Sequence, residues 1–270
     1  MNCVPFGDCQ MKKVDLREEW YDDRKKVSVV VVDVTGSARK LASGHLCGPT
    51  SAYYLAKALA SAALLASETS EQDEALSIQM KCTGPLGGFN VECTSDGALR
   101  GYTEKKVLDE FDTELEWDDR KVLGLQQLQV TRSVPGRIIS QGISGSIDGY
   151  LAGSLQRRAC IYLSAAVNHD AEVLHARGIM VEALPDSSES VTSFVPERFD
   201  VPSCELLAQM GLPEAKPVKT ATLRFECRCT PERAVAMLGA LDEKERAELP
   251  PEIDITCHMC GRTFTVKTSK

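Results

Sequence analysis

The sequence predicts an α+β fold: a layered mixed-sheet core domain with helices, a helical linker, and a small C-terminal module that contains four cysteines. Three observations lead to this prediction. Short alternating or β-branched segments between glycine-rich turns indicate strands, and one Ala/Leu-rich stretch indicates a buried helix. These elements do not alternate regularly, which favours α+β layers over a βαβ repeat. The length of 270 residues suffices for one large domain and a small module.

The expected core elements follow one another along residues 25–185. A β-branched run at 27–34 predicts a buried strand that Thr35-Gly36 ends. The Ala/Leu-rich helix at 52–66 is too short to span a bilayer, and Thr50 or Ser51 is expected to cap it. Further strands are expected at 75–82, 89–93, 98–102, 123–132, 138–147, 161–168 and 178–184, and a helix at 148–154.

The composition changes beyond Pro185, where Ser, Glu and Pro become frequent. We therefore divide the chain into residues 1–24 (a loose tail or an added first element), a core at 25–185, a linker at 186–222 and a module at 223–270. The linker is expected to contain one short helix, 203–210, and little core of its own. In the module, we expect a helix from Thr230-Pro231 to about Leu249 and short strands at 223–226, 253–256 and 263–266.

The strongest chemical signal is a pair of cysteine motifs in the module. Cys227-Arg228-Cys229 is followed, after 27 residues, by Cys257-His258-Met259-Cys260. Two such pairs supply the four sulfur ligands of a tetrahedral zinc site, with His258 as a surface imidazole between better ligands. Four sulfurs leave no open coordination position, which disfavours a zinc enzyme. Thiolates are also the groups that oxidants attack. The site is therefore either a permanent structural zinc site or one that releases its zinc on oxidation.

Other function classes find little support. A net charge of -8 argues against general binding of nucleic acid or an anionic membrane. Gly84-Pro85-Leu86-Gly87-Gly88 lacks the Lys-Ser/Thr of a phosphate-binding loop, and the four histidines lack a metalloprotease spacing. The other seven cysteines cannot all pair and no signal peptide is visible, which favours the reducing cytosol. A zinc ribbon that contacts nucleic acid, the ribosome or a protein partner remains the alternative. The remaining cysteines are expected to be buried (Cys47, Cys160), are candidates for exposure (Cys3, Cys9), or have no assigned role (Cys82, Cys93, Cys204).

The tail motif, preceded by Leu-Arg-Phe and followed after its first pair by Thr-Pro-Glu-Arg, resembles the redox-regulated holdase chaperones of the heat-shock protein 33 family. Two core segments, Gly84–Gly87 with Asp96–Tyr102 and Tyr150–Gln156, resemble motifs of the same family. The resemblance covers about 27–266. Leu155 stands where the family usually has Glu, the region 157–178 reads differently, and the core carries more cysteines than usual.

The resemblance implies a chaperone core domain at 25–185 and a zinc-binding redox-switch domain at 223–270. Cys227, Cys229, Cys257 and Cys260 would hold one zinc ion in a reduced, inactive form. Oxidation would form the disulfides Cys227–Cys229 and Cys257–Cys260, release zinc and unfold the switch domain and linker. The resemblance also implies unfolded client proteins as partners, a homodimer on activation, and no use of ATP. From the saturated four-sulfur site and the net charge of -8 we expect no enzymatic activity and no nucleic-acid or membrane partner.

Overall fold

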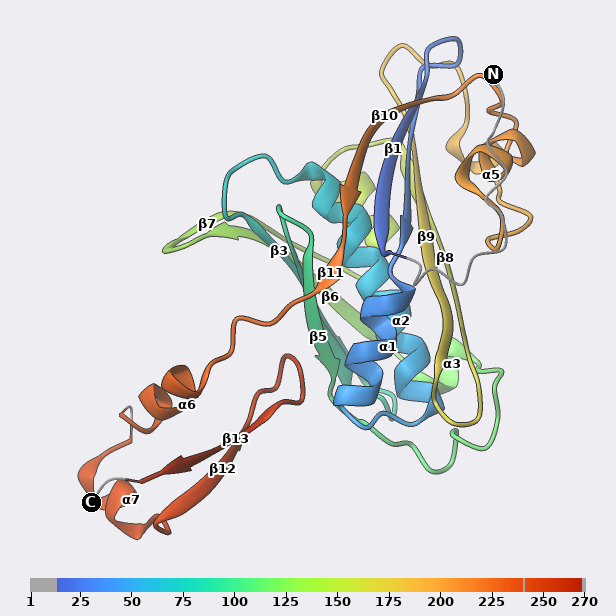
Figure 1. Cartoon of the computed structure of the whole chain (residues 1–270). Helices are drawn as coiled ribbons and strands as arrows, with labels where there is room; N and C mark the ends of the chain where they lie inside the picture. Colours follow the sequence, from blue (N-terminus) through green and yellow to red (C-terminus); the bar gives the residue numbers. More distant parts are fainter. Residues whose placement is uncertain (1–13, 240, 269–270) are drawn as a thin grey trace.

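Two β-sheets with helices packed between them form the main body of the computed structural model, which describes residues 14–239 and 241–268 (Figure 1). The first sheet has the order β10-β1-β2-β9-β8 and all its neighbours are antiparallel. Together with the second, mixed sheet described next, it confirms the α+β prediction. Its strands are β10 (Lys216–Thr222), β1 (Leu16–Asp22), β2 (Val27–Asp33), β9 (Val173–Ala183) and β8 (Ala159–Val167).

The second sheet has the order β11-β5-β4-β3-β6-β7 and contains one parallel pair, β11 with β5. Its other neighbours are antiparallel; β3 lies where an alternating pattern predicted a strand, and β4 and β5 follow the glycine-containing turns that predicted them. The strands are β11 (Arg224–Phe225), β5 (Ala98–Thr103), β4 (Gly88–Thr94), β3 (Ala75–Cys82), β6 (Gln126–Val134) and β7 (Arg137–Ser144).

The buried helix lies between the sheets as α2 (Pro49–Leu65), where it packs against strands of both. It is apolar on nearly every side, as a helix enclosed by two layers must be. The predicted N-cap residue is wrong, because Gly48 occupies the N-cap position and Pro49 begins the helix. The carboxylate of Asp112, from outside the helix, accepts the hydrogen bond from the Thr50 N–H (2.9 Å). Among the described helices, none is long and apolar enough to cross a membrane.

Several short helices complete the core. The helix α1 (Thr35–Gly44) was not predicted; it runs beside α2 and buries the small side chains Ser37, Ala38 and Ala42 together with Leu41. The expected helix near residue 148 forms as one α turn that continues as a π-helix. The remaining short helices are α3 (Asp119–Val122), α4 (Ile147–Gly149), η1 (Ala66–Glu68), η2 (Tyr150–Ser154) and η3 (Val191–Ser193).

Two segments outside the expected core are built into the first sheet. Strand β1 comes from residues 1–24 and lies between β2 and β10, and β10 comes from residues 186–222. The latter segment also forms the expected short helix, α5 (Ser203–Gln209). The expectation that this segment has little core is wrong, because its apolar side chains pack on β2 and β9 in a buried cluster that includes Phe194, Val201, Leu206, Leu207, Met210 and Leu212.

The C-terminal module extends from this body as a hairpin and two short helices (Figure 1). The hairpin strands are β12 (Glu252–Thr256) and β13 (Thr263–Lys267), as predicted. The single helix expected from 231 to about 249 is wrong: the structure has α6 (Pro231–Leu238) and α7 (Glu243–Glu248). Gly239 ends the first helix, and Asp242 and Glu245 exchange side-chain-to-backbone hydrogen bonds (2.8 and 3.0 Å) that start the second.

Candidate metal centre

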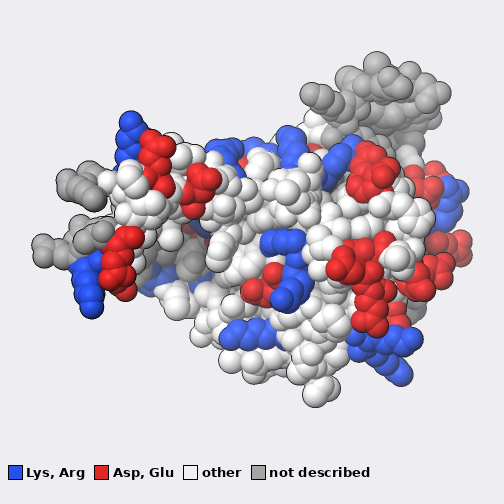
Figure 2. Space-filling model, turned by 90° about the horizontal axis from the view of Figure 1, so that it is seen from below, with Lys and Arg blue, Asp and Glu red and all other residues white. Residues whose placement is uncertain are grey.

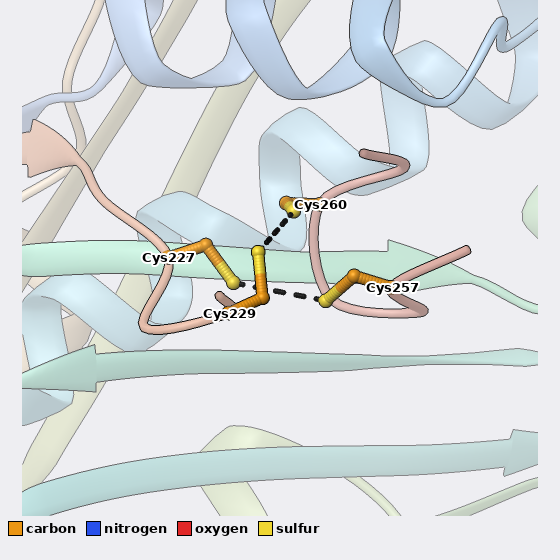
Figure 3. A group of neighbouring side chains, drawn as sticks. All are labelled: Cys227, Cys229, Cys257 and Cys260. Atoms are coloured by element: carbon orange, nitrogen blue, oxygen red, sulfur yellow. Dashed lines mark hydrogen bonds between the residues drawn. The ribbon is translucent and has the colours of Figure 1, made fainter. Parts of the chain in front are cut away.

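The four cysteine sulfurs of the module converge on one point, with all four within 4.8 Å of one another (Figure 3). Two of the separations join the two motifs: Cys227 Sγ to Cys257 Sγ at 3.8 Å and Cys229 Sγ to Cys260 Sγ at 3.4 Å. Four sulfurs at about 2.3 Å from a tetrahedral zinc ion would lie about 3.8 Å apart. The donor set and its spacing therefore fit a zinc ion.

The first pair is positioned by the core. Strand β11 runs parallel to β5, and backbone hydrogen bonds join Arg224 N–H to the Gly97 carbonyl (2.9 Å) and Glu226 N–H to the Leu99 carbonyl (3.1 Å). Leu223, just before this strand, is buried. The chain thus reaches Cys227 from a fixed position on the edge of the second sheet.

The second pair sits in a tight turn of its own. The Cys257 carbonyl accepts hydrogen bonds from the backbone of Cys260 (3.3 Å) and Gly261 (2.8 Å), and the Cys257 N–H donates to the Arg262 carbonyl (2.8 Å). Gly261 has φ of +73°, a left-handed conformation that glycine adopts without a Cβ penalty. This turn between β12 and β13 points both sulfurs to the same side.

The turn of the second pair also lies against the core. The Gly101 N–H on β5 donates to the Met259 carbonyl (3.0 Å), and His45 Nε2–H donates to the Gly101 carbonyl (2.9 Å). A Cβ on Gly261 would lie only 2.1 Å from the carbonyl oxygen of Gly44, at the end of α1. Strand β5 therefore holds both halves of the candidate site.

The surroundings of the sulfurs shift the pKa values of the cysteine thiols in different directions. Burial acts to raise the pKa of Cys227, but hydrogen bonds from the Cys229 backbone, from neighbouring thiols and from Arg100 lower this pKa overall. Burial raises the pKa of Cys229 and of Cys260. Burial also lowers the pKa of His45 to about 4, so its imidazole is neutral near pH 7 and donates as described.

A pocket of about 380 Å³ opens beside the site. One cysteine of each pair lines it, Cys229 and Cys257, together with the cationic side chains of Arg100 and Arg233. Solutes can therefore approach the sulfurs from this side.

The other residues considered from the sequence lie elsewhere. His258 does not join the sulfur cluster and makes an edge-on ring contact with Tyr102, with centroids 5.9 Å apart. Cys47 is buried, which confirms the prediction, and burial raises its pKa to about 11. Cys160 is only half-buried. Cys3 and Cys9 lie outside the described residues. His169 is exposed, whereas half-buried His175 contacts the Ser164 hydroxyl (2.7 Å).

Sequence reasoning missed the ionic side chains next to the first cysteine pair. Arg100 and Arg228 both contact the carboxylate of Glu92. A signal was present, because Ser95-Asp96-Gly97 predicts a tight hairpin turn and a tight turn places residues 92 and 100 opposite each other. Nothing in the sequence pairs either of them with residue 228.

The comparisons with known proteins agree on one family. Residues 19–267 match the model described as "Hsp33 protein". The chain is 28% identical over 262 residues to the 33 kDa chaperonin of Symbiobacterium thermophilum, covering 88% of each protein. It is 27% identical over 279 residues to a 33 kDa chaperonin of Thermus thermophilus, covering 90% of this chain and 80% of the relative.

The fold agrees as well. The crystal structure of the 33 kDa chaperonin (heat shock protein 33 homologue) of Thermotoga maritima matches with a TM-score of 0.76 and 19% identity, covering 94% of this chain and 95% of the other. The match of the family model extends over nearly the whole chain and includes the four-cysteine module. The chain therefore belongs to the Hsp33 family.

Proposed function

We propose that this chain is a redox-regulated, ATP-independent chaperone, a holdase and not an enzyme, that binds unfolding client proteins under oxidative stress. In the reduced, inactive form Cys227, Cys229, Cys257 and Cys260 hold one zinc ion. The observation that carries the proposal is the convergence of these four sulfurs within 4.8 Å. Four thiolates suit zinc, and the bound ion supplies a structural cross-link with no open catalytic position. Membership of the Hsp33 family supports the chaperone activity.

Oxidation of the thiolates would convert the site into two disulfides, Cys227–Cys229 and Cys257–Cys260. Each pair gives up two electrons to an oxidant such as hydrogen peroxide, which takes up protons and is reduced to two water molecules. The pocket beside Cys229 and Cys257 offers the oxidant an approach. All four ligands are then lost, and with them the roughly 10–16 kcal/mol that structural zinc contributes to small modules.

The unfolding that follows would expose a surface for clients. Residues 186–222 act as the linker in this proposal, and their apolar side chains cover Val29 and Val31 on β2 and Ile179 and Val181 on β9. Departure of the linker uncovers this face of the core domain, 25–185. Exposed apolar patches of this kind bind other proteins, which also supports a homodimer of the activated form. The reducing cytoplasm is the compartment in which the zinc-bound form would persist.

The charge distribution does not favour the zinc-ribbon alternative. On the face of the described residues seen in Figure 2, Lys and Arg side chains are interspersed with Asp and Glu and form no continuous basic surface. The net charge of -8 has the same implication. A salt-dependent shift of RNA or DNA in a gel would instead support that alternative.

Aggregation of a thermally unfolding client protein tests the proposal. We expect the reduced protein to be inactive and the protein treated with peroxide and mild heat to suppress aggregation, with zinc release measured in parallel by a chromogenic chelator. Cys257→Ser should lower zinc retention, whereas Cys82→Ser, outside the cluster, should behave like the wild type. Retention of zinc after peroxide with no gain of holdase activity would contradict the proposal.

A further inference from the structure

The side chain of Glu92 links the core to the first cysteine pair. It lies on β4 directly opposite Arg100 on β5, and only 14% of its side chain is exposed. Its two carboxylate oxygens accept hydrogen bonds from Arg100 Nε (3.0 Å) and Nη2 (2.8 Å) in a bidentate pair. Arg228, the residue between Cys227 and Cys229, donates its Nη2 to the same carboxylate (2.6 Å).

The two arginines held by Glu92 come from the surroundings of the sulfurs. Arg100 lines the pocket that Cys229 and Cys257 also line, and its positive charge helps to lower the pKa of Cys227. Arg228 is part of the Cys-x-Cys loop, so its ion pair with Glu92 fixes that loop against β4. One carboxylate therefore holds an arginine of the Cys-x-Cys loop together with an arginine of the pocket beside the sulfurs.

The charge of the metal-bound site explains why positive side chains beside it matter. Four thiolates around a divalent cation carry a net charge of -2, from four negative charges and two positive ones. The positive guanidinium groups of Arg100, at the pocket beside the sulfurs, and of Arg228, in the Cys-x-Cys loop, offset this charge. Groups that orient metal ligands from outside typically change metal affinity 10- to 100-fold when they are removed.

We infer that Glu92 is a positioning residue for the metal site: by fixing Arg100 and Arg228 it holds Cys227 and Cys229 in their ligating geometry. A strand of the core thus sets how tightly the redox module retains its metal. The inference rests on the proposed function only in taking the four cysteines as metal ligands.

Cobalt(II) binding to the reduced full-length protein tests this inference, because its absorption bands report tetrahedral thiolate coordination. We expect Glu92→Gln to lower Co²⁺ affinity roughly 10- to 100-fold in competition with a chelator. The matched control is Asp96→Asn, which removes the negative charge that pairs with Arg224 (2.5 Å) on the same sheet edge and lies outside the four-cysteine cluster. Asp96→Asn should stay within about twofold of the wild type.

The double variant, Glu92→Gln with Arg100→Gln, separates a positioning role of Glu92 from a merely structural contact. If Glu92 acts through Arg100, Glu92→Gln should add little to the loss already caused by Arg100→Gln. Should Glu92→Gln fail to fold, Arg100→Lys keeps the charge, loses the bidentate fork and should lower affinity by a smaller factor. Unchanged Co²⁺ affinity in a folded Glu92→Gln or Arg100→Lys protein would overturn the inference, whereas a wild type that binds neither Co²⁺ nor zinc would overturn the proposed function.

Discussion

Replacing Gly261 by alanine tests whether the core holds the second cysteine pair. Gly261 has φ of +73°, a conformation that costs an L-residue about 1–2 kcal/mol. The new Cβ would also lie 2.1 Å from the Gly44 carbonyl oxygen and 3.1 Å from the His45 nitrogen. These are backbone atoms that no side-chain rotation can move, so the turn must shift by about 0.9 Å before the first contact reaches even 3.0 Å.

The size of the effect follows from what that shift breaks. It separates Met259 from Gly101, and their backbone hydrogen bond contributes about 0.5–1.5 kcal/mol. Together with the conformational cost, the docked turn should lose about 1.5–3.5 kcal/mol, a factor of about 10 to 300 in its equilibrium. We expect Gly261→Ala to release zinc faster into a chromogenic chelator while still reduced, and to need less peroxide for half-maximal release.

Glycines elsewhere in the chain provide matched controls. Gly136 has φ of +80°, and no atom lies within 4 Å of the Cβ that alanine would add. Gly136→Ala therefore carries only the conformational cost of the left-handed backbone and should leave zinc retention unchanged. Gly44→Ala adds a Cβ on the core side of the same contact, 3.0 Å from the Cys260 carbonyl oxygen. It should also speed zinc release, but less strongly than Gly261→Ala. If Gly261→Ala retained zinc as well as Gly136→Ala does, the contact with Gly44 would not hold the site.

Three further substitutions test the fold. Thr230→Ala removes the hydroxyl that accepts the Arg233 N–H (3.2 Å) and should lower the stability of α6 by about 1 kcal/mol, measured by hydrogen exchange, whereas Thr230→Ser should not. Leu59→Ala, between the two sheets, should cost about 2–5 kcal/mol in urea unfolding; a cost below about 1 kcal/mol would contradict its full burial. Glu74→Gln should lower the free energy of unfolding by about 3 kcal/mol at neutral pH, because it removes the carboxylate that forms an ion pair with Arg132 at 2.6 Å. Burial acts to raise the pKa of Glu74, but hydrogen bonds from Arg132 and from the backbone of residues 70 and 71 lower it overall, below 4.5. The stabilisation is therefore present above pH 4.5 and lost as the pH falls through the lowered pKa, so wild type and variant should converge in acid; a constant difference would refute this.

Local signals explain which parts of the structure could be predicted. The hairpins β3–β4 and β4–β5 follow from glycine turns only a few residues long, and the cysteine cluster follows from two motifs whose spacing is itself a ligand geometry. The buried helix α2 follows from its composition. In each case neighbouring residues in the chain carry the information.

Non-local pairing explains what could not be predicted. Strand β1 reads as a polar tail, yet Arg17 and Asp22 are both only 2% exposed, because β1 lies between β2 and β10 and its burial depends on partners distant in sequence. The linker shows single apolar residues among prolines, such as Phe194 and Val201, with no period that reveals the face they share. The docking of Gly261 on Gly44 likewise joins residues more than 200 positions apart.

The route from the metal site to the linker is short and weakly packed. Immediately before Cys227 lies β11, which pairs with β5 through only two residues, and before it lies β10, whose side chains are nearly all exposed. The edge strand β10 is held chiefly by backbone pairing with β1, whereas the segment before it buries α5 on β2 and β9. Since stability within a protein follows buried contacts, strain or release at Cys227 would reach β11 and β10 before it reached α5. In the proposed function, the order of packing along residues 203–226 therefore predicts that detachment of residues 186–222 from the core would begin at the sulfur cluster.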